Sequence, residues 1–239
     1  MTMIIAEGGI NHNGDMSLAL RLVDAAVRAG ADAVKFQLYQ AELLAPEGEK
    51  RELLRQCQLT PVQMRTLHSY CTEKKITFLC TPFDKESADH LEKLVPFYKI
   101  GSGQGKDLDF LFHVSAKGKP MMISTGMMDF ADIRHSLTVV LPEVTLMHCA
   151  SLYPTPPEKA DLHRMQKMMR DFAYPVGYSD HTEGIAIALA AVALGATVIE
   201  KHLTLDKSML GPDHRASITP DELTALVKEC REIELALSA

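Results

Sequence analysis

The sequence has little that would support a disulfide framework or a membrane anchor. Its five cysteines are odd in number and form no Cys-x-x-Cys pair. The longest apolar run, residues 185–194, is far shorter than the roughly 20 residues of a membrane-spanning helix. No signal peptide, low-complexity segment or tail of like charge is in view. We therefore expect free thiols in a reducing cytoplasm and no membrane partner.

Positive charge is also scarce. Lysine and arginine together number 25, against 31 aspartates and glutamates, for a formal net charge of −6. This balance argues against a nucleic-acid partner, but it does not exclude an anionic substrate, because local lysines matter more than the total. A length of 239 residues, 46% of them hydrophobic, suits one domain of α/β barrel size, with a hydrophobic core large enough to be stable without a covalent cross-link.

Short apolar runs of strand character alternate with segments in which apolar residues recur at helical spacing. A glycine cap is predicted at Gly30, and a hydroxyl cap followed by proline opens helices at Thr60-Pro61 and Thr219-Pro220. The predicted strands are residues 3–6, 33–37, 76–80, 97–100, 121–124, 144–148, 176–178 and 197–201. The predicted helices are residues 17–29, 60–75, 85–94, 107–117, 130–140, 162–171, 183–194 and 219 onward, and a polar insertion at 39–59 contains a helical piece near 50–57.

Eight strand–helix pairs in this length predict a single-domain α/β fold, a (β/α)8 TIM barrel with parallel strands and right-handed crossovers. The alternative is an open doubly wound sheet. Two observations disfavour it. No Gly-x-Gly-x-x-Gly fingerprint follows the first strand, and nearly every strand ends in polar residues, which an open sheet would gather only at its switch point.

The carboxyl ends of barrel strands converge on one mouth. The polar residues expected there are Glu7, Lys35, Gln37, Thr81, Lys99, Ser102, Ser124, His148, Ser151, Tyr153, Ser179, His181, Glu200 and His202. Lysines with hydroxyls suit a ligand that carries phosphate or carboxylate. His181 and His202 end neighbouring strands, about 4.8 Å apart, and two imidazoles so placed can reach one divalent metal ion. The residues therefore predict a metal-assisted enzyme that acts on a small anion.

Each of these signals has a plainer interpretation. The two histidines could be satisfied structural residues, His148 could orient a loop, and Lys35 and Lys99 could form structural ion pairs. Lys99 could instead form a Schiff base, as lysines of barrel aldolases do, although the histidine pair would then be redundant. The cysteines next to site residues, Cys80 and Cys149, are more often packed thiols.

Nine motifs, in order and over essentially the whole chain, resemble those of the N-acetylneuraminate (sialic acid) synthases. They are Ala6-Glu7-Gly8-Gly9-Ile10-Asn11-His12-Asn13-Gly14, Val34-Lys35-Phe36-Gln37, Thr81-Pro82-Phe83-Asp84, Tyr98-Lys99-Ile100-Gly101-Ser102, Ser124-Thr125-Gly126-Met127, His148-Cys149-Ala150-Ser151-Leu152-Tyr153-Pro154, Gly177-Tyr178-Ser179-Asp180-His181, Glu200-Lys201-His202 and Gly211-Pro212-Asp213. Each motif alone is weak, but nine in order favour the barrel and the family.

The resemblance implies a transferase of sialic acid biosynthesis that condenses phosphoenolpyruvate with an N-acetylmannosamine-like aldose. Its implied metal is Mn²⁺ or Mg²⁺, held by His181 and His202. Glu7, Lys35 and Lys99 are the implied catalytic residues, with the lysines at the phosphoenolpyruvate. The other residues implied at phosphoenolpyruvate are Thr81, Ser102, Ser124, Ser151 and Ser179, and those implied near the sugar, together with Glu7, are Gln37, Tyr153 and Asp213.

Two departures from the family bear on the acceptor. The family usually carries a C-terminal antifreeze-like domain that contacts the sugar in a partner subunit. Residues 1–239 are expected to form the barrel alone, without that domain. The motif after Lys99 commonly ends in a carboxylate, where this chain has Gln104. The alternatives are a ligand-binding barrel without turnover, a different acceptor, or a subunit that needs a separate capping protein. The resemblance also implies a homo-oligomer, a dimer.

Overall fold

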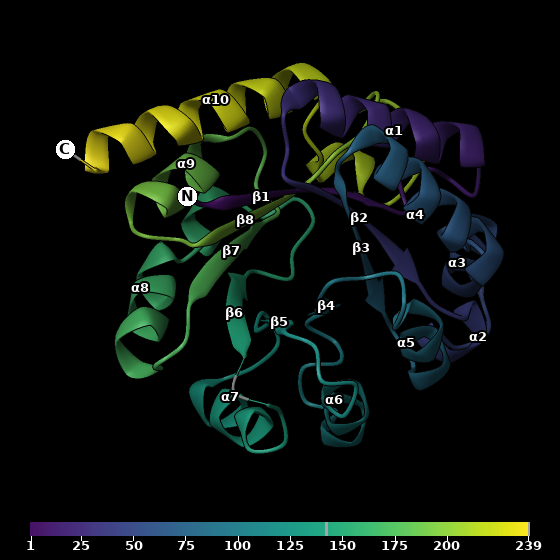
Figure 1. Cartoon of the computed structure of the whole chain (residues 1–239), viewed down its shortest axis with the longest axis horizontal. Coiled ribbons are helices and arrows are strands. Elements are labelled where there is room, and N and C mark those ends of the chain that lie inside the picture. The colour runs from purple at the N-terminus through teal and green to yellow at the C-terminus, as the bar shows by residue number, and fades with distance from the viewer. Residues whose placement is uncertain (142, 239) are drawn as a thin grey trace.

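The computed structural model describes residues 1–141 and 143–238, and it folds as eight parallel strands surrounded by helices (Figure 1). The strands are β1 (Met3–Gly9), β2 (Ala33–Leu38), β3 (Thr77–Pro82), β4 (Tyr98–Ile100), β5 (Met121–Ser124), β6 (Val144–Cys149), β7 (Val176–Asp180) and β8 (Val198–His202). The hydrogen-bonded order is β3-β2-β1-β8-β7-β6-β5-β4. Strands β3 and β4, at the two ends of this order, lie against each other and bring the sheet to a nearly closed barrel. The predicted (β/α)8 fold is confirmed.

The helices cover the outside of the barrel. They are α1 (Met16–Ala29), α2 (Ala41–Leu44), α3 (Glu49–Cys57), α4 (Pro61–Lys74), α5 (Lys85–Leu91), α6 (Leu108–Ser115), α7 (Phe130–Leu137), α8 (Leu162–Asp171), α9 (Ala186–Ala193) and α10 (Pro220–Leu237). The predicted caps are confirmed: Gly30 is left-handed at φ 78°, and Thr60 and Thr219 each form a capping box. Within the described ranges, no helix combines the length and the apolarity needed to cross a membrane.

The inward-facing residues change character along every strand, and this change positions the site. Side chains of a strand alternate between faces, so residues two apart point into the barrel together. One layer of the interior is apolar, and it contains Ile5, Ala33, Leu79, Phe97, Met122, Met147 and Val198. Two residues further along the same strands come Glu7, Lys35, Thr81, Lys99, Ser124, Cys149 and Glu200. A packed apolar plug therefore forms the floor on which the polar layer rests.

Strand β7 contributes glycine to the apolar layer, and the reason is steric. A Cβ atom on Gly177 would lie 2.6 Å from Sδ of Met147 and 2.8 Å from Cβ of Val198. The side chains of the neighbouring strands already fill this part of the interior. Only glycine leaves room, and the next inward residue on β7, Ser179, then joins the polar layer.

The structure extends β1 beyond its predicted end. The prediction ends this strand at residue 6, but parallel pairing with β2 and β8 draws Glu7, Gly8 and Gly9 into it, with a bulge after Glu7. The backbone of Glu7 is thus fixed on both sides. Several helices are shorter than predicted: α5, for example, ends at Leu91, and α7 ends at Leu137. The insertion folds as α2 and α3, as its helical pattern indicated.

Candidate active site

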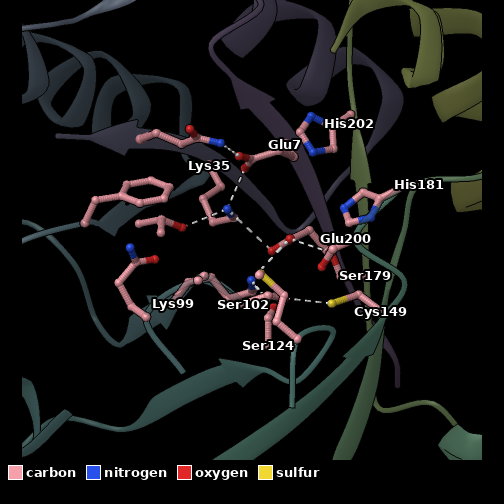
Figure 2. Close-up of a pocket in the computed structure, with 18 of the residues that line it drawn as sticks. Glu7, Lys35, Lys99, Ser102, Ser124, Cys149, Ser179, His181, Glu200 and His202 are labelled. Atoms are coloured by element: carbon pink, nitrogen blue, oxygen red, sulfur yellow. Dashed lines mark hydrogen bonds and ion pairs between the residues drawn. The ribbon is translucent and has the colours of Figure 1, made fainter. Parts of the chain in front are cut away.

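A cavity of about 380 Å³ opens at the carboxyl ends of the strands (Figure 2). All eight strands or the loops that follow them contribute to its wall. The lining residues are Glu7, Lys35, Gln37, Lys50, Thr81, Phe83, Lys99, Gly101, Ser102, Gly103, Gln104, Ser124, Met127, Cys149, Ser151, Tyr153, Ser179, His181, Glu200 and His202. Such a volume suits small polar substrates.

Four buried charges form the centre of the cavity. Nζ of Lys35 lies 2.8 Å from Oε2 of Glu7 and 3.6 Å from Oε2 of Glu200. Nζ of Lys99 lies 3.4 Å from Oε1 of the same Glu200. All four side chains are at most 5% exposed. Glu200 therefore bridges the two lysines, whereas Glu7 pairs with only one of them, Lys35 (Figure 2).

The pKa values of the two carboxyl groups in this cluster are shifted in opposite directions. Burial raises the pKa of Glu7 to about 7, against the opposing pull of Lys35. Burial alone would also raise the pKa of Glu200, but Lys35 and Lys99 lower it to about 2. At neutral pH Glu200 is ionised, whereas Glu7 lies near its midpoint and can accept or release a proton.

Hydroxyl groups surround the lysines. Lys35 donates to Oγ1 of Thr81 at 2.9 Å, and Lys99 donates to Oγ of Ser124 at 2.7 Å. A lysine ammonium is only a donor, so each of these hydroxyls must direct its own proton elsewhere. Ser179 donates to Oε1 of Glu200 at 2.9 Å. The cavity thus presents two cations and several hydroxyl donors, which is the chemistry that recognises phosphate and carboxylate oxygens.

The imidazoles of His181 and His202 face each other across one wall, with ring centroids 5.5 Å apart. Nδ1–H of His181 donates to the carbonyl of Ala150 at 2.7 Å, which leaves Nε2 as the nitrogen with a free lone pair. Nδ1 of His202 is buried, has no hydrogen-bond partner within the described ranges, and lies 3.7 Å from Oδ2 of Asp213. Burial lowers the pKa of both histidines to about 4.

Neutral imidazoles with free lone pairs are the state in which histidine binds a metal ion. The pair therefore fits a divalent cation. Within residues 1–141 and 143–238 no group of three or more histidine, cysteine or carboxylate side chains is gathered closely enough to complete a protein cage. An ion held by these two histidines would keep coordination positions for water or substrate oxygens.

A buried ion pair on the outer face of the barrel holds the strands that carry the two histidines. Nζ of Lys201 lies 2.7 Å from Oδ2 of Asp180, and both side chains are fully buried. The two residues are register partners between β7 and β8. Successive residues of a strand point to opposite faces, so His181 and His202, each one residue further on, point into the barrel. The ion pair on the outside therefore stabilises the register that places the two histidines inside.

The β1–α1 loop holds the long segment after β8 over this wall. Nδ2 of Asn11 donates to the carbonyl of Leu203 at 2.9 Å. Nδ2 of Asn13 donates to the carbonyl of Leu210, also at 2.9 Å. These bonds fix the two sides of the segment that presents Asp213 to His202.

The structure brings nearly all of the predicted site residues into one cavity. Glu7, Lys35, Gln37, Thr81, Lys99, Ser102, Ser124, Ser151, Tyr153, Ser179, His181 and His202 line it, and Asp213 stands behind His202 without lining it. Their individual roles stay predictions.

Strand β6 corrects the prediction for His148. Its side chain points away from the cavity, where Nε2–H donates to the carbonyl of Ala160 at 2.8 Å, and only 2% of the residue is exposed. The alternation of β6 presents Cys149 to the cavity instead. Counting two residues on from Met147 in the apolar layer would have found it.

Besides Cys149, the sequence prediction gave no role to two further residues that line the cavity. Glu200 was placed at the mouth but given no role, and the structure makes it the bridge between the lysines. Its position two residues before His202 on one strand was the available signal. Lys50, from α3 of the insertion, also lines the cavity, and no local pattern indicated that.

Comparison with known proteins agrees with this geometry. The model of the NeuB family matches residues 22–239. The chain belongs to the NeuB family. Relatives in this family include the N,N'-diacetyllegionaminic acid synthase of Campylobacter jejuni, 41% identical over 99% of this chain and 77% of that protein. The human N-acetylneuraminate-9-phosphate synthase is 38% identical over 99% of this chain and 71% of that protein.

A solved NeuB-like structure superposes on the whole chain. It is the N-acetylneuraminic acid (sialic acid) synthetase of Leptospira borgpetersenii, in complex with citrate, with a TM-score of 0.96 and 35% identity. The superposition covers 100% of this chain and 85% of that one. These three proteins, a synthetase and two synthases, match 99–100% of this chain, and this member of the NeuB family is an enzyme.

Proposed function

We propose that this enzyme condenses phosphoenolpyruvate with an N-acetylmannosamine-like aldose to give a sialic-acid-like 2-keto-3-deoxy sugar acid and inorganic phosphate. One observation carries the proposal: the same cavity contains two lysines surrounded by hydroxyl groups and a pair of neutral imidazoles. The first feature suits the anionic donor, and the second suits activation of a carbonyl. The names of two relatives, an N,N'-diacetyllegionaminic acid synthase and an N-acetylneuraminate-9-phosphate synthase, support this choice of product class.

Phosphoenolpyruvate would lie against Lys35, Lys99 and the hydroxyls of Thr81, Ser102, Ser124, Ser151 and Ser179. With Glu7 protonated, the two lysines and ionised Glu200 leave the cluster with one net positive charge. An incoming anion favours that state because it repels an ionised Glu7. Binding of phosphoenolpyruvate would therefore favour protonation of Glu7, and the protonated carboxyl group can then give its proton to the aldehyde oxygen.

His181 and His202 would hold the divalent ion, Mn²⁺ or Mg²⁺. When bound, that ion supplies Lewis acidity for an aldehyde carbonyl. The hydrogen bond from His181 to Ala150 fixes the tautomer that this role requires. Asp213 faces the remaining imidazole nitrogen of His202 and orients the ring from behind.

The reaction makes one carbon–carbon bond and one carbon–oxygen bond, to the oxygen of water, and it breaks the carbon–oxygen bond to phosphate. The enol carbon of phosphoenolpyruvate attacks the aldehyde carbon, and the aldehyde oxygen takes the proton from Glu7. Water adds to the carbon that bears phosphate and returns one proton to the Glu7 carboxylate. The carbon–oxygen bond to phosphate then breaks, and the leaving phosphate takes the second proton of the water, whose oxygen becomes the 2-keto oxygen. Lys35 and Lys99 offset the anionic charge as it moves, and their hydrogen bonds to Thr81 and Ser124 hold them in place.

The acceptor would occupy the side of the cavity nearest Gln37 and Tyr153. Gln37 donates to Glu7 at 3.1 Å, and the ring of Tyr153 packs on His181 with centroids 4.1 Å apart. The Tyr153 side chain is about half exposed at the mouth. This placement leaves it free to pack on a sugar face.

Phosphate release tests the proposal. The enzyme is incubated with phosphoenolpyruvate, Mn²⁺ and a panel of aldoses with and without an N-acyl group. We expect release that requires an N-acylamino aldose and is lost on chelation of the metal. Folded protein that binds phosphoenolpyruvate but releases no phosphate with any acceptor would instead indicate a binding barrel, or a subunit that needs a capping protein.

Two further properties belong to the same proposal. We infer a homodimer, for which light scattering in solution is the test, and a monomer would contradict it. We also place the enzyme in the cytoplasm. All five cysteines are free in the structure, in keeping with a reducing compartment.

A further inference from the structure

Ser102, Gly126, Cys149 and Ser151 pack tightly at the corner of the cavity formed by the loops after β4, β5 and β6. A Cβ atom on Gly126 would lie 2.6 Å from Oγ of Ser151 and 2.7 Å from Sγ of Cys149. The thiol is 4% exposed and lines the cavity. Figure 2 shows it pointing toward Ser102. The crowding around Gly126 holds the thiol at this spot.

Hydrogen-bond accounting assigns the thiol a direction. Oγ of Ser102 lies 3.1 Å from Sγ of Cys149, and it accepts the backbone N–H of Gly126 at 3.3 Å. A serine hydroxyl has one proton to give and two lone pairs with which to accept. If Cys149 donates its S–H, both lone pairs of Ser102 are used and its proton is free for a third partner. Sulfur is the poorer acceptor, so an anion in the cavity takes that proton in preference to the thiol.

We propose that Cys149 is a positioning residue of the anion subsite, whose thiol donates to Ser102 and thereby directs the Ser102 hydroxyl proton at the bound phosphoenolpyruvate. This inference rests on the proposed function, since that function places the donor at Ser102. The other four cysteines do not line the cavity. Cys149 is thus the cysteine whose thiol orders this subsite.

A double-mutant cycle on the affinity for phosphoenolpyruvate tests the inference. Calorimetry with Mn²⁺ present measures binding in the wild type, Cys149→Ala, Ser102→Ala and the double variant. Ser102→Ala is expected to weaken binding about tenfold, because it removes a hydrogen bond to a charged group. Cys149→Ala is expected to weaken binding about fivefold. In the Ser102→Ala background the same change should have less than a twofold effect, because its target is gone.

Rescue and control variants separate positioning from packing. Cys149→Ser keeps a donor at the same place and should bind within about twofold of the wild type. Cys230→Ala removes a buried thiol outside the cavity and should leave the affinity unchanged. A fivefold loss in the Ser102→Ala background, or a Cys149→Ser variant as weak as Cys149→Ala, would overturn the inference.

Alkylation of the wild type adds a measurement that needs no variant. Iodoacetamide labelling followed by mass spectrometry should show that phosphoenolpyruvate slows labelling of Cys149 at least tenfold. Equal labelling with and without the ligand would contradict the placement of the thiol in the subsite. Binding without phosphate release would refute only the proposed reaction, whereas turnover with an additive cycle would refute only the role of Cys149.

Discussion

Two isosteric changes in the same cavity should have opposite effects on stability. Glu200→Gln removes a carboxylate whose pKa is lowered from its ordinary value of 4.5 to about 2 by two lysines. Glu7→Gln removes one whose pKa is raised from 4.5 to about 7 by burial. The two pKa values are displaced in opposite directions, and one pKa unit corresponds to 1.36 kcal/mol, so each carboxylate is expected to change the free energy of unfolding by on the order of 3 kcal/mol.

The signs follow from linkage. A depressed pKa gives Glu200 a stabilising contribution that is present above pH 4.5 and lost as the pH falls toward 2. A raised pKa gives Glu7 the reverse: its contribution is favourable below pH 4.5 and is lost as the pH rises through 7. At pH 8 the ionised Glu200 therefore stabilises the fold, and the ionised Glu7 destabilises it.

Thermal unfolding at pH 8, without ligand, checks the pair. Glu200→Gln should lower Tm by about 6–12 °C, from about 3 kcal/mol and 2–4 °C per kcal/mol in a chain of this size. Glu7→Gln should unfold at or above the wild-type temperature, yet lose at least about a hundredfold in activity, because its proton is gone. Equal losses of stability in the two variants would refute the electrostatic assignment of the cluster.

Three other variants probe the supports of the site. Lys201→Met should lower the free energy of unfolding by about 3–5 kcal/mol, because it leaves the buried carboxylate of Asp180 without a partner. Replacing both residues by apolar ones should restore most of the melting temperature. A single variant as stable as the wild type would contradict the role of the ion pair in joining β7 to β8. Asn13→Ala should raise the KM for the aldose about fivefold and leave that for phosphoenolpyruvate within twofold, since it frees the segment that carries Asp213; equal changes in both would contradict this. Gly126→Ala should weaken phosphoenolpyruvate binding at least tenfold, because the new Cβ would lie closer than 3 Å to two side-chain atoms. An unchanged affinity by calorimetry would contradict this and show that the neighbouring side chains can shift.

Much of this architecture could be predicted from the sequence, because periodicity is a local property. The alternation of strands and helices predicts a barrel, and the polar residue at each strand end predicts the mouth. The nine motifs identify the family, which the match over residues 22–239 confirms.

The errors came from properties that depend on neighbours. The glycines after Glu7 resemble a loop, but pairing on both sides keeps them in β1. His148 was expected at the mouth because it ends the predicted strand 144–148, whereas the inward register of β6 selects Cys149. The bridge made by Glu200 depends on lysines that lie more than 100 positions away in the chain, and no local pattern records it.

The most direct test of the central claim is a crystal structure of the protein soaked with phosphoenolpyruvate and Mn²⁺, with anomalous data that locate the metal. The account predicts manganese between His181 and His202, and phosphoenolpyruvate on Lys35 and Lys99 in the same cavity. Manganese elsewhere, or phosphoenolpyruvate bound away from both lysines, would contradict it.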